Sequence, residues 1–378
     1  MELKAEVTKV NDTRVKVSAE VDAESVSKEL AAQYKKYANK YKFPGFRAGK
    51  APRPVINNAV GKETVYLDAT EEVLNDAYHL LIEQESLRPV GEPNFEGKEN
   101  EMFVEDKTPF KFEFELEVSP VIELSSYEPV EGFIPPTEAT EEDIKSQIDM
   151  YKGYAGLEDD EEVTEEVVVE KMGFESMEKL REAISGLVEN EKKAALPRLK
   201  EDVVSLKLRD RVEVEPTEEM VAFVNNALLN EMFQNLQQYG LTFDQYLASR
   251  KMSSDEFYED VKKQAIDEAK TRMALDAWVR HFDLATTDED LAEEFAKAGV
   301  KDVEATKKKW AEDGRLWRLR EAIERSKAVE NAVESAVFTV DADKAAHQFD
   351  DDNAKAEADK AEEKEEPAKA EEAESTEE

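Results

Sequence analysis

The sequence predicts an α+β domain at the N-terminus, followed by a mainly α-helical and extended C-terminal region. Two patterns carry this prediction. Apolar and polar residues alternate in residues 1–21 and again in 110–118, as in half-buried strands, whereas helical periodicity dominates from about residue 176 to 336. The length of 378 residues exceeds one ordinary core and predicts two or three domains.

Composition narrows the class of protein. Charged residues make up 37 % and hydrophobic residues 40 %, and the formal net charge is -39, which predicts a large solvated surface. The absence of cysteine excludes disulfides, thiol nucleophiles and cysteine-based metal sites, and fits a reducing cytoplasm. The N-terminus lacks the apolar segment of a signal peptide, and no run reaches the roughly 18 apolar residues of a membrane span. We therefore expect a cytoplasmic protein with no membrane partner.

The first predicted domain spans residues 1–118. Residues 1–21 form a hairpin around Asn11-Asp12, and Asp22 caps a helix whose apolar residues share one face. Pro52 and Pro54 open the next helical pieces, and a longer helix covers about 63–85. A strand over 110–118 closes the domain, with one apolar and one charged face.

Two connecting segments follow. Residues 119–152 contain four prolines before about residue 140, which predicts an extended linker ending in a short helix near 141–151. Residues 153–170 form an acidic connection with eight acids and no base, a composition typical of a solvated loop.

Residues 171–340 are predicted to be helical. Sequence motifs typical of capping boxes begin at Thr242, Ser253 and Thr286. A long predicted helix from Ser176 contains Pro197, where we expect a kink. Residues 336–340 form a short terminal strand. Residues 341–378 hold sixteen acids against five lysines and almost no large apolar side chains, which predicts a disordered acidic tail.

Little in the sequence supports catalysis. The three histidines, His79, His281 and His347, fall in a helix, at a helix end and in the acidic tail, with no spacing of a ligand set or a triad. A phosphate-binding loop and a dinucleotide fingerprint are both missing. We predict no catalytic residue, no metal site and no cofactor.

A basic stretch interrupts the acidic chain. Residues 31–62 hold eight Lys or Arg and no Asp or Glu. One interpretation is a solvated lysine-rich helix followed by an ordinary turn. The alternative is a binding surface, because Phe46 and Arg47 stand at a turn flanked by glycine and proline, where an aromatic beside an arginine is typical of binding hot spots. RNA together with protein is the natural partner for such a surface.

The apolar residues of the helical region allow two interpretations, a buried core or an exposed binding surface. Met220, Met232, Met252 and Met273 occupy apolar helical positions beside several aromatic residues. Most of these side chains are expected in the core. A methionine-rich exposed fraction would instead suit the binding of unlike apolar segments.

The sequence resembles the bacterial trigger factor family, chaperones at the ribosomal exit tunnel. The resemblance rests on the motif formed by Gly45, Phe46, Arg47, Gly49, Lys50 and Pro52, and on the order of hairpin, helix, loop and helix around it. It extends over about residues 1–340. The family often has a basic residue where this chain has Ala48.

The resemblance implies a function. The six motif residues would bind the ribosome, with Phe46, Arg47 and Lys50 against a ribosomal protein and ribosomal RNA at the tunnel exit. The helical arms of the C-terminal chaperone domain would hold nascent or unfolded polypeptides without ATP, and the chain would form a homodimer off the ribosome. Family members carry a prolyl isomerase domain of about 100 residues, a usual domain size, whereas only the acidic connection stands at that place here.

Two other functions stay open at this point. One is a peptidyl-prolyl cis-trans isomerase acting in protein folding, although the catalytic domain looks absent. The other is a chaperone that works away from the ribosome.

Overall fold

The computed structural model describes the chain except residues 96, 98–101, 155–163, 165–166, 168–172 and 350–378. It consists of two compact units, each built from separate stretches of chain. Unit 1 comprises Met1–Tyr127 and Arg209–Ala328, and unit 2 comprises Glu128–Leu208 and Val329–Glu378. The domain limits predicted from the sequence follow the chain order and stay a prediction.

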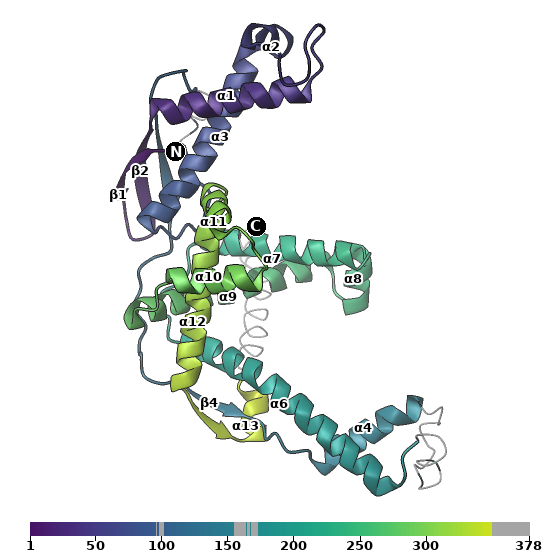
Figure 1. Cartoon of the computed structure of the whole chain (residues 1–378). Coiled ribbons are helices and arrows are strands. Elements are labelled where there is room, and N and C mark those ends of the chain that lie inside the picture. Colours follow the sequence, from purple (N-terminus) through teal and green to yellow (C-terminus); the bar gives the residue numbers. More distant parts are fainter. Residues whose placement is uncertain (96, 98–101, 155–163, 165–166, 168–172, 350–378) are drawn as a thin grey trace, which may run out of the picture. The chain divides into compact units, whose positions relative to one another are not determined.

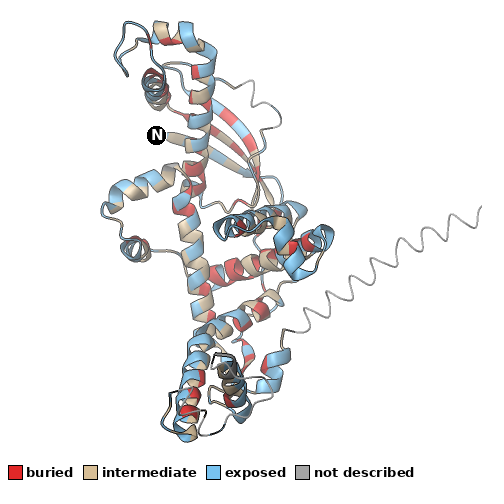
Figure 2. Cartoon of the chain, turned by 90° about the vertical axis from the view of Figure 1, so that its right-hand side faces the viewer, coloured by how far each residue is buried: buried red, intermediate tan, exposed pale blue. Residues whose placement is uncertain are grey.

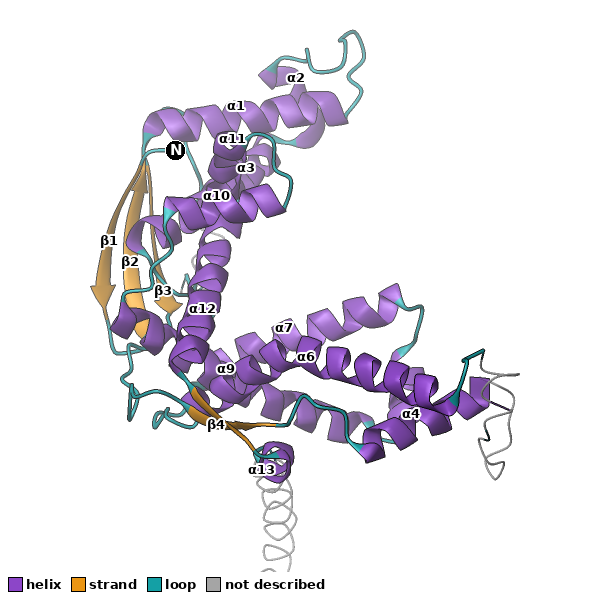
Figure 3. Ribbon diagram, turned by 60° about the horizontal axis from the view of Figure 1, so that its bottom comes forward, coloured by secondary structure: helices purple, strands orange, loops and turns teal. Residues whose placement is uncertain are grey.

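Unit 1 begins with a three-stranded antiparallel sheet in the order β1-β2-β3, visible in Figure 3. The strands are β1 (Leu3–Lys9), β2 (Arg14–Val21) and β3 (Phe110–Glu117). Val17 lies opposite Phe114, and every second pair along β2 and β3 is likewise buried. The alternation predicted from the sequence is confirmed for β2 and β3, since every second residue is buried and the residues between are intermediate or exposed (Figure 2).

Three helices complete the N-terminal part of unit 1: α1 (Ala23–Lys40), α2 (Arg53–Val60) and α3 (Lys62–Glu85). The Asp22 carboxylate caps α1 by accepting hydrogen bonds from the amides of Glu24 and Ser25, as the sequence predicted. Apolar residues of α1 and α3, including Leu30 and Leu81, share one core with the buried face of the sheet.

Unit 1 also holds most of the helical region. Its helices are α7 (Glu218–Gln238), α8 (Phe243–Arg250), α9 (Ser254–Phe282), α10 (Asp288–Lys297), α11 (Val303–Glu312) and the larger part of α12 (Arg315–Ser335). The capping boxes at Thr242 and Ser253 are confirmed. The third box lies one residue later than predicted, at Thr287 with Asp290, because the Thr286 hydroxyl donates instead to the Arg320 carbonyl.

Unit 2 joins distant parts of the sequence. It includes α4 (Glu141–Tyr154), most of α6 (Met177–Arg209), which is a single helix that contains Pro197, and the end of α12. The predicted terminal strand is β5 (Val337–Val340), which pairs in parallel with β4 (Glu131–Ile134). Part of the predicted linker is therefore an extended strand that pairs with a strand far along the chain.

The sequence predicts that a disordered tail begins at residue 341, but the structure has a helix directly after that residue. Ala342–His347 form a short helix, α13, so His347 is helical and not part of a disordered segment. Asp341 caps α13, Ala345 is buried, and the Gln348 side chain hydrogen-bonds the backbone of Phe133 in β4. These contacts offset the cost of ordering the segment. Residues 350–378 of the predicted tail, and most of the acidic connection 153–170, lie outside the described residues.

Candidate functional site

The loop between α1 and α2 contains the whole motif and extends beyond the ends of both helices (Figure 1). Two short hydrogen-bonded turns shape it. The Phe46 amide donates to the Phe43 carbonyl at 3.1 Å, and the Lys50 amide donates to the Arg47 carbonyl at 2.9 Å. The Gly49 amide donates to the Ala38 carbonyl of α1 at 2.8 Å, which ties the second turn to the end of that helix.

Two glycines give the loop its path. Gly45 has a φ of 83° and Gly49 a φ of 76°, in the left-handed region that side chains disfavour. A Cβ atom on Gly49 would lie 2.5 Å from Oδ1 of Asn39, whereas a Cβ on Gly45 would meet nothing within 4 Å. The predicted loop is therefore held at Gly49 by close contact with α1, and at Gly45 by backbone conformation alone.

The loop buries one aromatic residue and exposes another. Phe43 belongs to the core with only 7 % of its surface exposed, whereas Phe46 is 44 % exposed. Arg47 and Lys50 are exposed as well, and Pro52 is the exposed N-cap residue of α2. Phe43 thus anchors the loop, and the three side chains that the resemblance assigns to a partner are accessible to one.

The last turns of α1 add lysines beside the loop. Lys35, Lys36 and Lys40 are exposed. The Lys40 ammonium lies 5.6 Å from the centre of the Tyr41 ring, which stacks on Tyr37 at 5.8 Å. The Tyr37 hydroxyl donates to Asp68 at 2.6 Å, and this hydrogen bond raises the pKa of Tyr37 to about 12.

The charge of this region is largely uncompensated. Of the eight basic residues in 31–62, Arg53 alone forms an ion pair with a described residue, Asp106 at 2.9 Å. We call the exposed group Lys35, Lys36, Lys40, Lys42, Arg47 and Lys50 the docking surface. Positive charge that forms no ion pair with the described residues suits an anionic partner, since no such pair has to be broken first.

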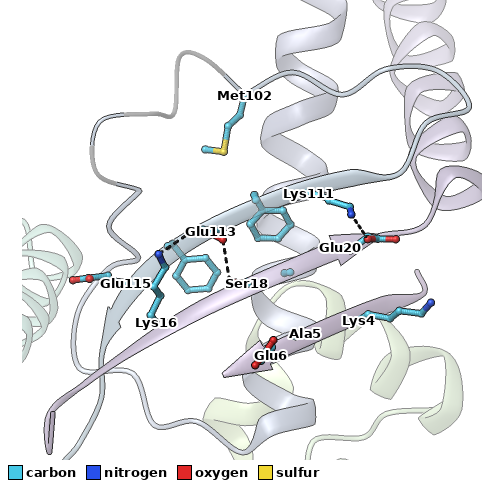
Figure 4. Close-up of a pocket in the computed structure, with 13 residues that line it drawn as sticks. Lys4, Ala5, Glu6, Lys16, Ser18, Glu20, Met102, Lys111, Glu113 and Glu115 are labelled. Carbon is cyan, nitrogen blue, oxygen red and sulfur yellow. Dashed lines mark hydrogen bonds and ion pairs between the residues drawn. The ribbon is translucent and has the colours of Figure 1, made fainter. Parts of the chain in front are cut away.

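The outer face of the sheet shows the opposite arrangement. A hollow of about 610 Å³ lies on this face, lined mainly by alternating basic and acidic residues of the three strands (Figure 4). Lys16 pairs with Glu113 and Lys111 pairs with Glu20, each at 3.0 Å. Two of its three lysines are thus paired within the sheet, and the hollow offers an anionic ligand much less than the docking surface does.

Two of the three histidines pack against other parts of unit 1. His79 is buried on α3 against Gly314, and burial lowers its pKa. His281 stacks on Tyr127 with ring centres 3.7 Å apart. Within the described part of the chain, no group of three or more His, Cys, Asp or Glu side chains could hold a metal ion.

The helices α7, α8 and α9 form an arm with both buried and exposed apolar residues. Met220, Met273, Phe257 and Trp278 are buried, as expected of core residues. Large apolar side chains also lie on the surface: Phe223, Phe233, Tyr239, Leu241 and Tyr258. Sequence periodicity did not separate these two groups, because helical spacing marks a face without showing whether another element covers it.

A shallow groove runs between α7 and α9. Val221, Ala222 and Ile266 provide its apolar lining, and charged side chains border it. With the exposed aromatic residues of the same arm, it makes an accessible apolar surface of the kind that marks interaction sites.

In the described residues, every helix is too short or too polar to cross a membrane.

The family models match most of the chain. Residues 3–151 match the model described as bacterial trigger factor protein (TF), and residues 176–334 match its C-terminus model. Only residues 152–175 lie between the two matches, far fewer than the roughly 100 residues of a usual small domain. No isomerase domain stands between the two matched regions.

Individual relatives agree with this assignment. A trigger factor of Natranaerobius thermophilus is 34 % identical over 41 % of this chain, and the alignment spans 34 % of that protein. A trigger factor of Halothermothrix orenii is 24 % identical, with 88 % of this chain and 99 % of that protein covered. A solved trigger factor chaperone chain is 16 % identical, with a TM-score of 0.41, and covers 87 % of this chain and 99 % of that one. The two family models together match well over half of the chain, and the chain therefore belongs to the bacterial trigger factor family.

Proposed function

We propose that this chain is an ATP-independent, ribosome-associated chaperone of the cytoplasm that binds nascent polypeptides at the exit tunnel. The observation that carries the proposal is the docking surface, where Phe46, Arg47 and Lys50 are exposed on a loop shaped by two left-handed glycines. The Arg47 guanidinium can form bidentate hydrogen bonds with a phosphate or a carboxylate, and Phe46 can fill an apolar pocket of a ribosomal protein.

The client-binding part of the proposal rests on the arm. Its exposed aromatic and aliphatic side chains, together with the groove between α7 and α9, offer contact to apolar segments of many sequences. Such contacts are weak and distributed, so a client can dissociate without nucleotide hydrolysis. A homodimer off the ribosome is compatible with this surface and stays a proposal.

Cosedimentation with ribosomes tests the proposal. Replacing Phe46→Ala together with Arg47→Ala should abolish pelleting, because it removes the aromatic anchor and the arginine while leaving the buried Phe43 in place. The same variant should suppress aggregation of an unfolded client as well as the wild type does, since the arm is untouched.

Three outcomes separate the alternatives. If the double variant pellets with ribosomes as the wild type does, the result would contradict ribosome binding by this loop. Client protection without any pelleting of the wild type would favour a chaperone that works off the ribosome. Isomerisation of X-Pro bonds above background by the purified chain would support the isomerase function.

A further inference from the structure

We infer that two copies of this chain associate through strand β1, edge to edge, so that their two three-stranded sheets join into one. The inference rests on one part of the proposed function, the homodimer, and assigns its interface. It does not depend on ribosome binding, because β1 contains no residue of the docking surface.

The edge of the sheet at β1 is open. Figures 1 and 3 show β1 as the outermost strand, and among the described residues β2 is the only strand that pairs with it. The Glu2 carbonyl accepts a hydrogen bond from the Asp22 amide at 3.2 Å. Because the backbone groups of an antiparallel strand alternate in direction, those of Leu3, Ala5 and Val7 point away from β2. An edge of this kind can pair with another strand.

The apolar side chains of β1 are only partly covered. Leu3, Ala5 and Val7 are of intermediate burial and pack against the core of unit 1. On β2, Val17 and Val21 are completely buried, because strands pair with β2 on both of its sides. A further strand beside β1 would bury more of its apolar row, and that burial favours association.

The charges of β1 select a second copy of β1 as the occupant. Charged residues on an edge strand usually oppose pairing with another strand. Here Lys4 and Glu6 are exposed on the same face, carry opposite charges and form no ion pair with a described residue. A two-fold axis perpendicular to the sheet places the two strands antiparallel. With Ala5 opposite Ala5 of the second copy, each Lys4 faces a Glu6, and each Leu3 faces a Val7.

Other registers of the same strand pair fit less well. Centring the pair on Lys4 or on Glu6 places two like charges directly opposite each other, which destabilises a strand pair. Centring it on Leu3 or on Val7 loses both Lys4–Glu6 pairs. A client segment of unrelated sequence does not in general carry opposite charges at these two positions, whereas a second copy always does.

The interface is small, so the association is reversible. A contact made by one short strand from each copy is smaller than the roughly 1,200 Å² at which stable interfaces begin. The dimer should therefore depend on protein concentration, and a change of charge should be enough to dissociate it.

Two charge variants test the interface by sedimentation velocity over a series of protein concentrations. Lys4→Glu and Glu6→Lys each turn both opposite-charge pairs into like-charge pairs, and each should raise the dissociation constant by on the order of tenfold. An equimolar mixture of the two variants should associate as the wild type does, because each glutamate then faces a lysine again. Association of the mixture also shows that both variants are folded.

Three results would overturn the inference. One is a wild type that is monomeric at every concentration, and another is a pair of single variants that each self-associate as the wild type does. The third is a mixture that stays monomeric although both variants keep the circular dichroism of the wild type. A monomeric wild type that binds an extended peptide along β1 would show that the occupant is a client segment and not a second copy.

Cysteine crosslinking tests the register. Because the chain has no cysteine, Ala5→Cys introduces a single thiol, which lies directly opposite its copy. Opposed residues of this kind have Cα atoms about 5.5 Å apart, within the range of a disulfide, so diamide should crosslink this variant into dimers. The control is Thr8→Cys, which is more exposed but lies about 20 Å from its copy in this register. Equal crosslinking of the two variants would overturn the Ala5 register.

Ribosome cosedimentation keeps this inference separate from ribosome docking. Glu6→Lys should still pellet with ribosomes, whereas Phe46→Ala with Arg47→Ala should still self-associate. A wild type that pellets but stays monomeric would contradict the inference alone. A wild type that self-associates but does not pellet would contradict ribosome docking and support the inference.

Discussion

At the scale of single residues, the loop depends on two glycines that are alike in backbone angle and unlike in surroundings. Gly45 and Gly49 both have positive φ, but only Gly49 lies against another element, the end of α1. Asn39, its neighbour, donates from Nδ2 to the Lys35 carbonyl and is held in place by that bond. The second turn is therefore positioned by packing, and the first by backbone conformation.

We expect Gly49→Ala to reduce ribosome binding more than Gly45→Ala does. Each substitution forces a side chain into the left-handed region, at a cost of about 1–2 kcal/mol. Only Gly49→Ala adds a clash, with Oδ1 of Asn39. Cosedimentation at a series of ribosome concentrations measures the order of the two variants.

The clash can be tested separately from the strain. Adding Asn39→Ala to Gly49→Ala should recover the part of ribosome binding that was lost to the clash, while Asn39→Ala alone should have a small effect. If the combined variant binds no better than Gly49→Ala, contact with Asn39 is not what positions the turn.

At the scale of elements, two helices use the same cap with different chemistry. The box of α8 pairs Thr242 with the neutral Gln245, whereas the box of α10 pairs Thr287 with Asp290. The Asp290 carboxylate accepts from the Thr287 amide at 2.7 Å and from Lys327 at 2.9 Å. The amide hydrogen bond, then Lys327, lower the pKa of Asp290 to about 2.

The contribution of this cap to the stability of α10 should therefore depend on pH. Because the pKa of Asp290 falls from 3.8 to about 2 on folding, its contribution is fully present above its unfolded pKa. That contribution is lost as the pH falls through about 2. The Asp290→Asn variant should be less stable than the wild type at pH 6, and the difference should shrink between pH 4 and pH 2 in urea denaturation.

The matched variant for this experiment is Gln245→Ala in the α8 cap. It removes a cap of the same geometry without a titrating group, so its loss of stability should be the same at pH 6 and pH 3. A difference for Asp290→Asn that does not change with pH would show that the carboxylate charge is unimportant to the cap.

Prediction from sequence was best for elements with a strong local pattern. The strand β3 alternates apolar and charged residues along its length, and Asp22 has the acceptor that a helix start requires. The strand β4 was missed because Gly132 interrupts its pattern and its partner, β5, comes two hundred residues later. A Cβ on Gly132 would lie 2.5 Å from Cγ1 of Val203 in α6, so glycine is needed there for packing.

At the scale of the whole molecule, buried charge joins the N-terminal elements of unit 1 to its helices. Asp276 on α9 is 1 % exposed and forms ion pairs with Arg88, which follows α3, and with Arg325 of α12. Arg88 also pairs with Glu324, and Arg320 pairs with Glu83 of α3 at 2.7 Å. Three segments far apart in the sequence thus share one network.

We expect Asp276→Ala to destabilise unit 1 by about 1.5–3 kcal/mol, because it removes the buried carboxylate that Arg88 and Arg325 share. Urea denaturation followed by tryptophan fluorescence measures the loss, since Trp278 is buried on the same helix. As a control, Asp12→Ala breaks the exposed pair with Lys9 and should leave the midpoint unchanged. Equal midpoints for the two variants would contradict a structural role for the network.

The sequence by itself determined the class of each half and the family resemblance, because these depend on local patterns of charge and polarity. It also located the basic stretch in an acidic chain. Only the tertiary structure decided that Phe43 is buried and Phe46 exposed, that Gly49 lies against Asn39, and that Lys35, Lys36 and Lys40 form no ion pair with a described residue. Those properties depend on which segments contact one another in the folded protein, and a local sequence pattern does not show such contacts.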